Sequence, residues 1–167
     1  MRIIVDAAAG MLHAGDRSIR CSIGRSGIIP AEDKREGDGA TPIGEWPVCA
    51  VLLRPDRVLP PGALRLPWRW IRPADGWSDD PADPAYNRPV LHPYRHSAER
   101  LWRADGLYDV IVVLGHNDAP PVAGSGSAIF LHCWQDGAAT EGCVAIHRAA
   151  LLALLPQLSP GDVVSIR

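Results

Sequence analysis

The chain has 167 residues, of which 47% are hydrophobic, and this is enough for a single domain with a sizeable core. Lysine and arginine number 17 against 19 aspartate and glutamate residues, so the basic surplus typical of nucleic-acid binding is absent and we expect no nucleic-acid partner. No apolar run approaches the ~20 residues of a membrane span, and the start, Met1 to Asp6, is too short and too soon charged for a secretory signal, so the sequence as written predicts a cytoplasmic protein.

Short β-branched or apolar runs, bounded by Gly, Asp and Pro turns, predict most of the structure as strands. These runs are Ile3–Val5, Ser18–Ile23, Gly44–Leu53, Tyr108–Leu114, Ala128–Trp134 and Val163–Ile166. One helix is predicted from about His147 to Leu155, ended by Pro156. Its residues are apolar nearly all round, so it is expected to lie buried against the sheet. The predicted fold is mainly β: a largely antiparallel sandwich or barrel with one packed C-terminal helix.

Residues 60–103 differ from the rest of the chain in composition and in hydrophobic pattern. Prolines, arginines and aspartates surround several aromatic residues with little periodicity, and these aromatics are Trp68, Trp70, Trp77, Tyr86, Tyr94 and Trp102. So many aromatic residues argue against disorder. We expect an ordered insertion over one end of the sheet, acting as a substrate-binding lid or as a small satellite core under a long loop.

Two short motifs carry the chemistry. Phe130-Leu131-His132 places a histidine at the end of an apolar strand, and Thr140-Glu141-Gly142-Cys143 places a cysteine after a glycine, at what reads as the edge of a helix. An imidazole and the positive end of a helix are what a thiol needs to become a thiolate near neutral pH. Cys143 is therefore the predicted nucleophile of an acyl transfer.

The other cysteines fit a packing role better. Cys21 and Cys49 lie in apolar, strand-like runs, where a cysteine usually fills space. Side chains alternate along a strand, so Cys133 should face away from His132 and pack in the opposite layer.

A zinc site is the competing interpretation. His116, His132, Cys133, Cys143 and His147 are suitable ligand types. Neighbouring residues on one strand point apart, however, and no pair has a usual ligand spacing. We therefore expect no metal and no cofactor.

The motifs resemble those of the bacterial L,D-transpeptidase catalytic domain. Thr140-Glu141-Gly142-Cys143-Val144-Ala145 resembles the family's Ser/Thr-His-Gly-Cys-hydrophobic-Arg signature, and Phe130-Leu131-His132 resembles its upstream histidine motif. Thr41-Pro42-Ile43-Gly44 resembles its Thr-Pro-x-Gly turn. The resemblance covers nearly the whole chain. It implies one catalytic domain over 1–167, with residues 60–103 as an insertion or lid.

The resemblance implies a cysteine enzyme that acts on peptidoglycan stem peptides, as donor and as acceptor, through a thioester acyl-enzyme. Cys143 would be the nucleophile, His132 the general base and later acid, and backbone amides at Gly142 and Cys143 the oxyanion donors. Carbapenems acylate such enzymes. If water replaces the acceptor amine, the same site is an L,D-carboxypeptidase or endopeptidase. A non-catalytic cell-wall-binding module that uses the Trp-rich insertion is a further alternative.

The chain departs from the signature at two positions. Glu141 stands where the family has histidine, and Ala145 where it has arginine. Arg88 is a candidate substitute for holding a substrate carboxylate, or a solvated surface arginine. Glu141 could orient His132 or cap the following helix. His116 is a candidate substrate contact, or a turn former.

Two further residues, Thr140 and Trp134, are expected in the substrate site because they flank the two motifs. The family implies a periplasmic or cell-envelope location with a role in wall synthesis and cell shape. That agrees with the sequence only if a leader has been removed. The acceptor and the oligomeric state do not follow from the sequence, and a monomer is the working expectation.

Overall fold

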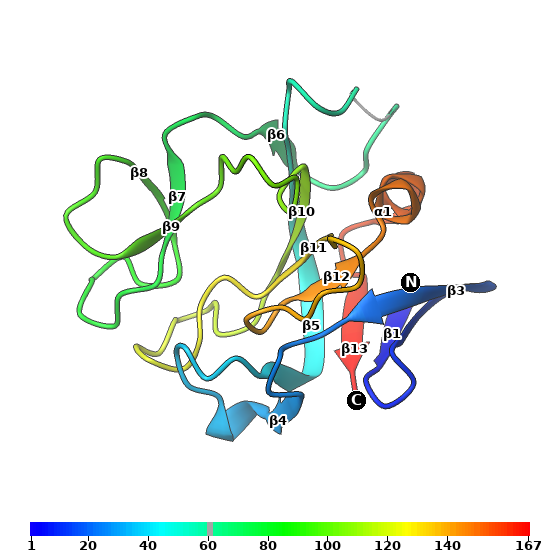
Figure 1. Cartoon of the computed structure of the whole chain (residues 1–167), viewed down its shortest axis with the longest axis horizontal. Helices are drawn as coiled ribbons and strands as arrows, with labels where there is room; N and C mark the ends of the chain where they lie inside the picture. The colour runs from blue at the N-terminus through cyan, green and yellow to red at the C-terminus, as the bar shows by residue number, and fades with distance from the viewer. Residues whose placement is uncertain (60–61) are drawn as a thin grey trace.

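The computed structural model describes residues 1–59 and 62–167, and its main feature is a sheet that closes on itself (Figure 1). Neighbouring strands follow the order β10, β11, β12, β3, β2, β1, β13, β5, and β5 pairs again with β10. The strands of this ring are β1 (Arg2–Asp6), β2 (Met11–Ala14), β3 (Arg17–Ser22), β5 (Thr41–Leu53), β10 (Val110–Leu114), β11 (Phe130–Cys133), β12 (Val144–Ile146) and β13 (Val163–Ile166). The expectation of a mainly β, barrel-like fold is confirmed.

The long strand β5 closes the ring. Its first half pairs with β13 through Gly44–Pro47, and its second half pairs with β10 through Val48–Leu53, with a register shift at the end of β10. Two short strands, β4 (Ile28–Pro30) and β6 (Trp68–Trp70), add to β5 in parallel. Most ring pairings are antiparallel, and the exceptions are β1 with β13 and β11 with β12. The parallel β11–β12 pair later positions the two motifs.

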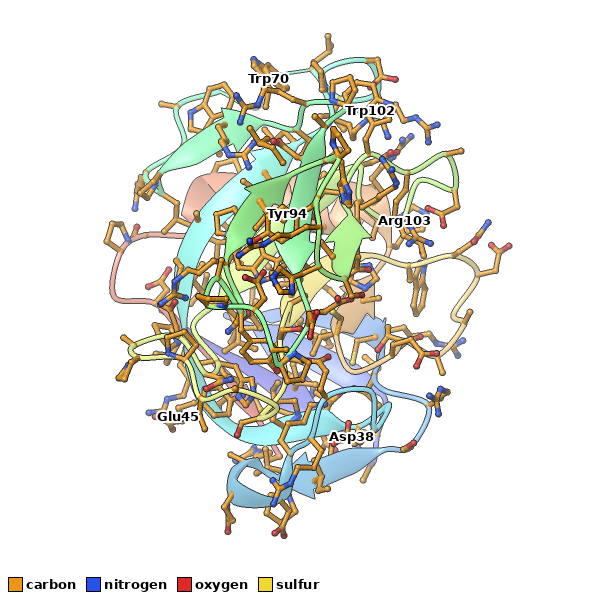
Figure 2. All side chains as sticks on the ribbon, turned by 90° about the vertical axis from the view of Figure 1, so that its left-hand side faces the viewer. Asp38, Glu45, Trp70, Tyr94, Trp102 and Arg103 are labelled. Carbon is orange, nitrogen blue, oxygen red and sulfur yellow. The ribbon has the colours of Figure 1, made fainter. Side chains whose placement is uncertain are left out.

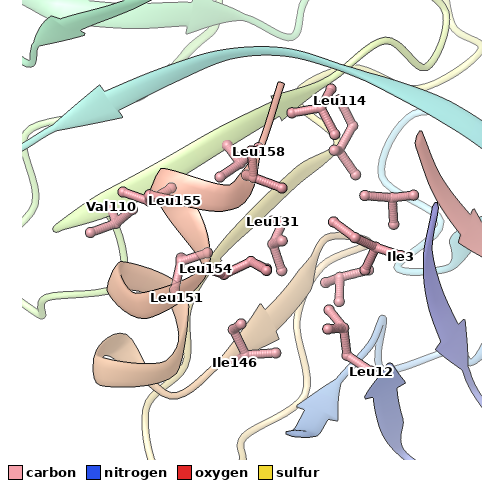
Figure 3. Packing of buried hydrophobic residues seen from close by; sticks show 14 of the residues in the cluster. Ile3, Leu12, Val110, Leu114, Leu131, Ile146, Leu151, Leu154, Leu155 and Leu158 are labelled. Atoms are coloured by element: carbon pink, nitrogen blue, oxygen red, sulfur yellow. The ribbon is translucent and has the colours of Figure 1, made fainter. Parts of the chain in front are cut away.

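The main hydrophobic core lies between the ring and one helix (Figure 3). Helix α1 (Arg148–Leu154) continues into a 3-10 turn, Leu155–Gln157, which confirms the predicted helix almost to the residue. His147 begins it, because its Nδ1 accepts a hydrogen bond from the Ala149 amide. Leu151 and Leu154 are fully buried against β10 and β11, as the apolar pattern predicts. No helix within 1–59 and 62–167 is long and apolar enough to cross a membrane.

The insertion folds onto the outside of the ring. It carries a second sheet of three antiparallel strands, β7 (Asp75–Ser78), β8 (Pro89–Leu91) and β9 (Ala98–Arg100), with β7 in the middle. Figure 2 faces this side of the molecule. Ile71 and Leu101 are buried against Ile111 and Phe130 in a second hydrophobic cluster, which also contains Cys143. The insertion is therefore a satellite core, and this core covers the candidate nucleophile.

Candidate active site

Strand β11 separates two environments by simple alternation. Leu131 and Cys133 belong to the main core, whereas Phe130 belongs to the second cluster beneath the insertion. His132 therefore faces the insertion side, and it lines a cavity there. Cys133 is 2% exposed, and its thiol points at the Val110 carbonyl, 3.9 Å away. The packing role predicted for Cys133 matches this position.

Cys143 reaches the same side because β12 runs parallel to β11, with Ala145 beside His132. Gly142 makes the approach possible: its φ is +139°, and a Cβ there would lie 3.0 Å from the Ala40 carbonyl oxygen. The expectation of a helix edge is wrong, since Cys143 precedes strand β12 and the helix begins only at Arg148. Within residues 1–59 and 62–167, no α-helix begins at Cys143 to support a thiolate there.

The thiol is held by the backbone on two sides. Cys143 Sγ donates to the Ala128 carbonyl at 3.1 Å and accepts from the Phe130 amide at 3.3 Å. Burial raises the pKa of this thiol to about 12, with a smaller contribution from the negative charge of Glu99. The raised pKa favours a neutral thiol at neutral pH, and a thiol in this state would need a base to act as a nucleophile.

His132 is suited to that role. Its Nδ1 lies 2.7 Å from the Cys133 carbonyl oxygen, and since a carbonyl only accepts, Nδ1 carries the proton and Nε2 has a free lone pair. Burial lowers the pKa of this imidazole to about 4. At neutral pH His132 is therefore uncharged and able to take a proton. The Tyr108 ring packs against it in a T-shaped arrangement, with the ring centroids 5.2 Å apart.

A cavity of about 580 Å³ brings most of the expected site residues together. It is lined by Cys143, His132, Trp134, Thr140 and Glu141 among others. A cavity of this volume accommodates a ligand of the size of a short peptide segment. The two motifs thus contribute to one site, although they are separated in the sequence.

The loop before Cys143 is fixed by Thr140. The Thr140 hydroxyl donates to the Cys143 carbonyl at 2.6 Å and accepts from the Gly142 amide at 3.1 Å. Because the Gly142 amide is already committed, the amide of Cys143 is the better candidate for an oxyanion donor. Glu141 neither orients His132 nor caps a helix: its carboxylate accepts from Arg25 Nε, at 3.0 and 2.9 Å, on the surface.

A comparison of the sequence with models of protein families shows the family of the chain. The family model of the L,D-transpeptidase catalytic domain, YkuD, matches residues 1–166. The chain belongs to the L,D-transpeptidase family. No curated protein matches the chain. Among solved structures, it is similar to the crystal structure of an L,D-transpeptidase from Xylanimonas cellulosilytica, with 14% identity and a TM-score of 0.47. That match covers 99% of this chain, which spans 59% of the other.

Two residues expected in the candidate site lie elsewhere. Arg88 and His116 line a separate cavity of about 300 Å³, whose lining does not include Cys143. Arg88 Nη1 donates to Asp118 at 2.7 Å, and His116 Nε2 donates to the Ser125 carbonyl at 3.0 Å. The structure therefore brings neither Arg88 nor His116 into the Cys143 cavity, and it pairs Arg88 with Asp118. That Arg88 takes the place of the family arginine, at the position where this chain has the buried Ala145, stays a prediction.

The structure also places residues around the candidate site that the sequence did not indicate. Asn87 is buried, and its Oδ1 accepts from the Ala128 amide at 3.1 Å and from Trp77 Nε1 at 2.9 Å. Ala128 in turn presents its carbonyl to the thiol, with a positive φ of 52°. Asn87 itself lines the second cavity, whereas Glu99 and Lys34 line the Cys143 cavity. Only Asn87 carried a local signal, as an asparagine in a turn before Arg88-Pro89.

No group of three or more His, Cys, Asp or Glu side chains is placed to hold a metal ion in the described part of the chain. The zinc interpretation therefore gains no support from the geometry. His132 and Cys133 lie on opposite faces of β11, and His147 begins helix α1.

Proposed function

We propose that this protein is a cysteine-dependent L,D-transpeptidase that acts on peptidoglycan stem peptides in the cell envelope, with residues 1–167 as one catalytic domain. The observation that carries the proposal is that a buried neutral thiol, Cys143, and a buried neutral imidazole, His132, line one cavity. Nucleophile and base in a shared cavity are the basic requirement of covalent acyl transfer.

The first half of the reaction forms the acyl-enzyme. As Cys143 Sγ attacks the donor carbonyl, its proton passes to Nε2 of His132, and the amide of Cys143 donates to the developing oxyanion. The carbon–nitrogen bond of the donor then breaks, and the imidazolium returns the proton to the leaving amine. The products are a thioester on Cys143 and the released terminal residue.

In the second half, the amine of another stem peptide attacks the thioester. His132 takes the proton of this amine, the carbon–sulfur bond breaks, and the sulfur regains a proton from the imidazolium. Water in place of the amine gives the carboxypeptidase or endopeptidase outcome by the same steps. The pKa values of about 12 and about 4 disfavour a resting thiolate–imidazolium pair, so proton transfer accompanies attack.

A non-catalytic wall-binding module is the alternative from another class. It predicts that substitution of Cys143 leaves all function intact. The buried placement of Cys143 and its contact with the Ala128 carbonyl favour the enzyme, because a simple binding surface needs no thiol held beside a neutral base.

Mass spectrometry of purified muropeptides incubated with the protein tests the proposal. A cross-linked dimer together with a released D-amino acid is expected for the transpeptidase, and a shortened monomer with the same released D-amino acid but no dimer is expected for the carboxypeptidase. Cys143→Ser should abolish both. Identical product spectra for the wild type and Cys143→Ser would refute the cysteine mechanism, and would favour the binding module if neither protein changes the muropeptides.

A further inference from the structure

The imidazole of His132 is held by two contacts. Its Nδ1 lies 2.7 Å from the Cys133 carbonyl oxygen, but one hydrogen bond does not fix the tilt of the ring, because the last torsion of a histidine side chain has broad energy wells. The ring of Tyr108 supplies the second contact, since the two rings form a T-shaped pair with an interplanar angle of 86°. The Cys133 amide also donates to the Leu107 carbonyl at 3.1 Å, so the backbone beside one ring is joined to the backbone beside the other.

Tyr108 is itself anchored, and the anchor comes from the insertion. Tyr108 is 5% exposed, and its hydroxyl donates to Glu99 Oε1 at 2.6 Å. Glu99 lies on β9, an edge strand of the insertion sheet. Arg103 contacts both residues: its guanidinium carbon lies 5.3 Å from the centroid of the Tyr108 ring, and its Nη1 lies 4.0 Å from Glu99 Oε1. Burial, with the charge of Glu99, raises the pKa of Tyr108 well above its ordinary value, so the hydroxyl remains a donor at neutral pH.

We propose that Tyr108 is a positioning residue for His132, and that Glu99 locks Tyr108 in place from the insertion. The packed ring keeps the imidazole in the orientation in which Nδ1 meets Cys133 and Nε2 stays free, and it keeps water from one side of the base. Orientation matters because a misplacement of about 1 Å can cost roughly a hundredfold in rate. That His132 acts as a base rests on the proposed function. The hold of Tyr108 on the imidazole does not.

A direct contact with substrate is the competing role for Tyr108, because Tyr108 also lines the Cys143 cavity. Its hydroxyl is already committed to Glu99, which leaves only the ring for such a contact. The two roles change different quantities. A positioning residue acts on the state of the base and on the rate of the chemical step, whereas a substrate contact acts on binding.

Nuclear magnetic resonance of the free protein tests the hold on His132 without any substrate. In protein with isotope-labelled histidines, proton–nitrogen correlation spectra distinguish a protonated ring nitrogen from a bare one, and they follow each imidazole through a pH titration. The His132 signals are assigned by their loss in His132→Gln. In the wild type, Nδ1 should carry the proton as a single tautomer at neutral pH, and the titration midpoint should lie near 4.

Tyr108→Leu should give both tautomers of His132 and raise the midpoint by about one pH unit or more, because water then reaches the imidazole. Tyr108→Phe and Glu99→Ala break the same hydrogen bond, so they should give the same, smaller change, and the double variant should change no more than either alone. These two milder variants carry the test if Tyr108→Leu does not fold.

Ile71→Ala is the matched control. Ile71 is 1% exposed in the same outer cluster, but it does not line the Cys143 cavity, so its truncation should leave the tautomer of His132 unchanged. The proposal is overturned if Tyr108→Leu keeps the wild-type tautomer and midpoint, or if Ile71→Ala shifts them equally. A wild-type His132 spectrum in both Tyr108→Phe and Glu99→Ala would overturn the link to the insertion.

Kinetics then show whether Tyr108 acts through His132. Tyr108→Leu should lower the saturating rate of carbapenem acylation more than about tenfold and leave the half-saturating concentration within about twofold, and Tyr108→Phe should restore most of the rate. In a His132→Gln background, Tyr108→Leu should cost less than about twofold, because the residue it positions is gone. An undiminished cost there, or a raised half-saturating concentration at an unchanged rate, would make Tyr108 a substrate contact and overturn the proposal.

Failure of the positioning role and failure of the proposed function give different results. A His132 spectrum that responds to Tyr108→Leu, in a protein that neither reacts with a carbapenem nor processes muropeptides, would retain the hold on the imidazole and remove the transpeptidase. Muropeptide turnover with a His132 spectrum that no Tyr108 substitution moves would do the reverse.

Discussion

Cys143 and His132 are both removed from water, and burial shifts their pKa values in opposite directions, to about 12 and about 4. Both shifts favour the uncharged form. The free enzyme therefore holds a thiol and an imidazole, in contrast to enzymes that store a thiolate beside a charged histidine. The expectation from the sequence that a helix end would assist the thiolate does not hold, because Cys143 precedes strand β12. In the proposed mechanism His132 alone would activate the thiol.

The pH dependence of the reaction should report this imidazole. His132 accepts a proton only when neutral, so kcat/KM should persist through mildly acidic pH and fall as pH drops through about 4, the lowered pKa of His132. A fall centred near 6.5, the ordinary histidine value, would contradict the assignment. His132→Gln should lower turnover by at least about a hundredfold at the plateau, and His116→Ala should cost clearly less.

Two labelling reagents should select different cysteines. A carbapenem should add one mass to Cys143, because its acyl group occupies the cavity where His132 acts as base, and Cys143→Ser should abolish this adduct. Iodoacetamide at neutral pH should label Cys49 first, because Cys49 is partly exposed whereas burial holds the pKa of Cys143 and of Cys133 at about 12. Carbapenem mass on Cys133 would show that the faces of β11 are assigned wrongly.

Among the helices and strands, the sequence predicted the ones that a local pattern of apolar residues marks. Helix α1 has a continuous apolar pattern and a proline after it, and β11 is a short apolar run. Strand β12 was missed because three apolar residues merge with the helix signal that follows. What makes Val144–Ile146 a strand is parallel pairing with β11 and antiparallel pairing with β3. Those partners lie far enough along the chain that no local pattern reports them.

The same reasoning explains which residues of the candidate site could be predicted from the sequence and which could not. Cys143 and His132 could be found because residue type and short spacing carry their chemistry. Glu99 and Asp79 could not, because their place in the cavity depends on how the insertion sheet folds onto the ring. Arg88 was chosen for its charge and its place in the insertion, and nothing in the sequence indicated that the fold pairs this charge with Asp118.

Asn87 links the insertion to the loop that holds the thiol. Its amide accepts from Trp77 and Ala128 and donates to the Asn117 carbonyl at 2.7 Å and the His116 carbonyl at 3.2 Å. Asn87→Ala should lower the free energy of unfolding by about 2–3 kcal/mol, because buried partners lose their hydrogen bonds. It should also slow carbapenem acylation more than tenfold, because the Ala128 carbonyl that positions Cys143 is released.

Asn117→Ala is the matched control for this link. Asn117 makes side-chain hydrogen bonds with Val122 and Gly126, so its loss should also destabilise the protein. The side-chain hydrogen bond to the Ala128 amide is made by Asn87. Urea unfolding and acylation rates, measured on both variants, separate the two roles. Equal slowing of acylation by both variants would mean that loop stability alone, and not the contact of Asn87 with Ala128, governs the thiol.

In the whole molecule, one wall of strands separates two cores. Strands β5, β10 and β11 send some side chains inward, to the main core with α1, and others outward, to the cluster beneath the insertion. Ring closure leaves few strand edges open to pairing with another chain. Because Cys143 belongs to the outer cluster, the packing of the insertion should control access to the thiol, whereas the inner core should matter only for stability.

Two leucine truncations test this division. Leu101 in the outer cluster and Leu154 in the inner core are both fully buried, so each change to alanine should cost about 2–5 kcal/mol of unfolding free energy. Their effects on Cys143 should differ. Leu101→Ala loosens the satellite core over the thiol and should raise its rate of modification by iodoacetamide several-fold, whereas Leu154→Ala should leave that rate near the wild-type value. Rates are compared in buffer without denaturant, where urea titration shows both variants to be folded.

If both substitutions speed labelling in proportion to lost stability, the thiol is reached by global unfolding and the insertion is not a separate cover. A selective effect of Leu101→Ala would instead show that the insertion opens as a unit above an intact barrel.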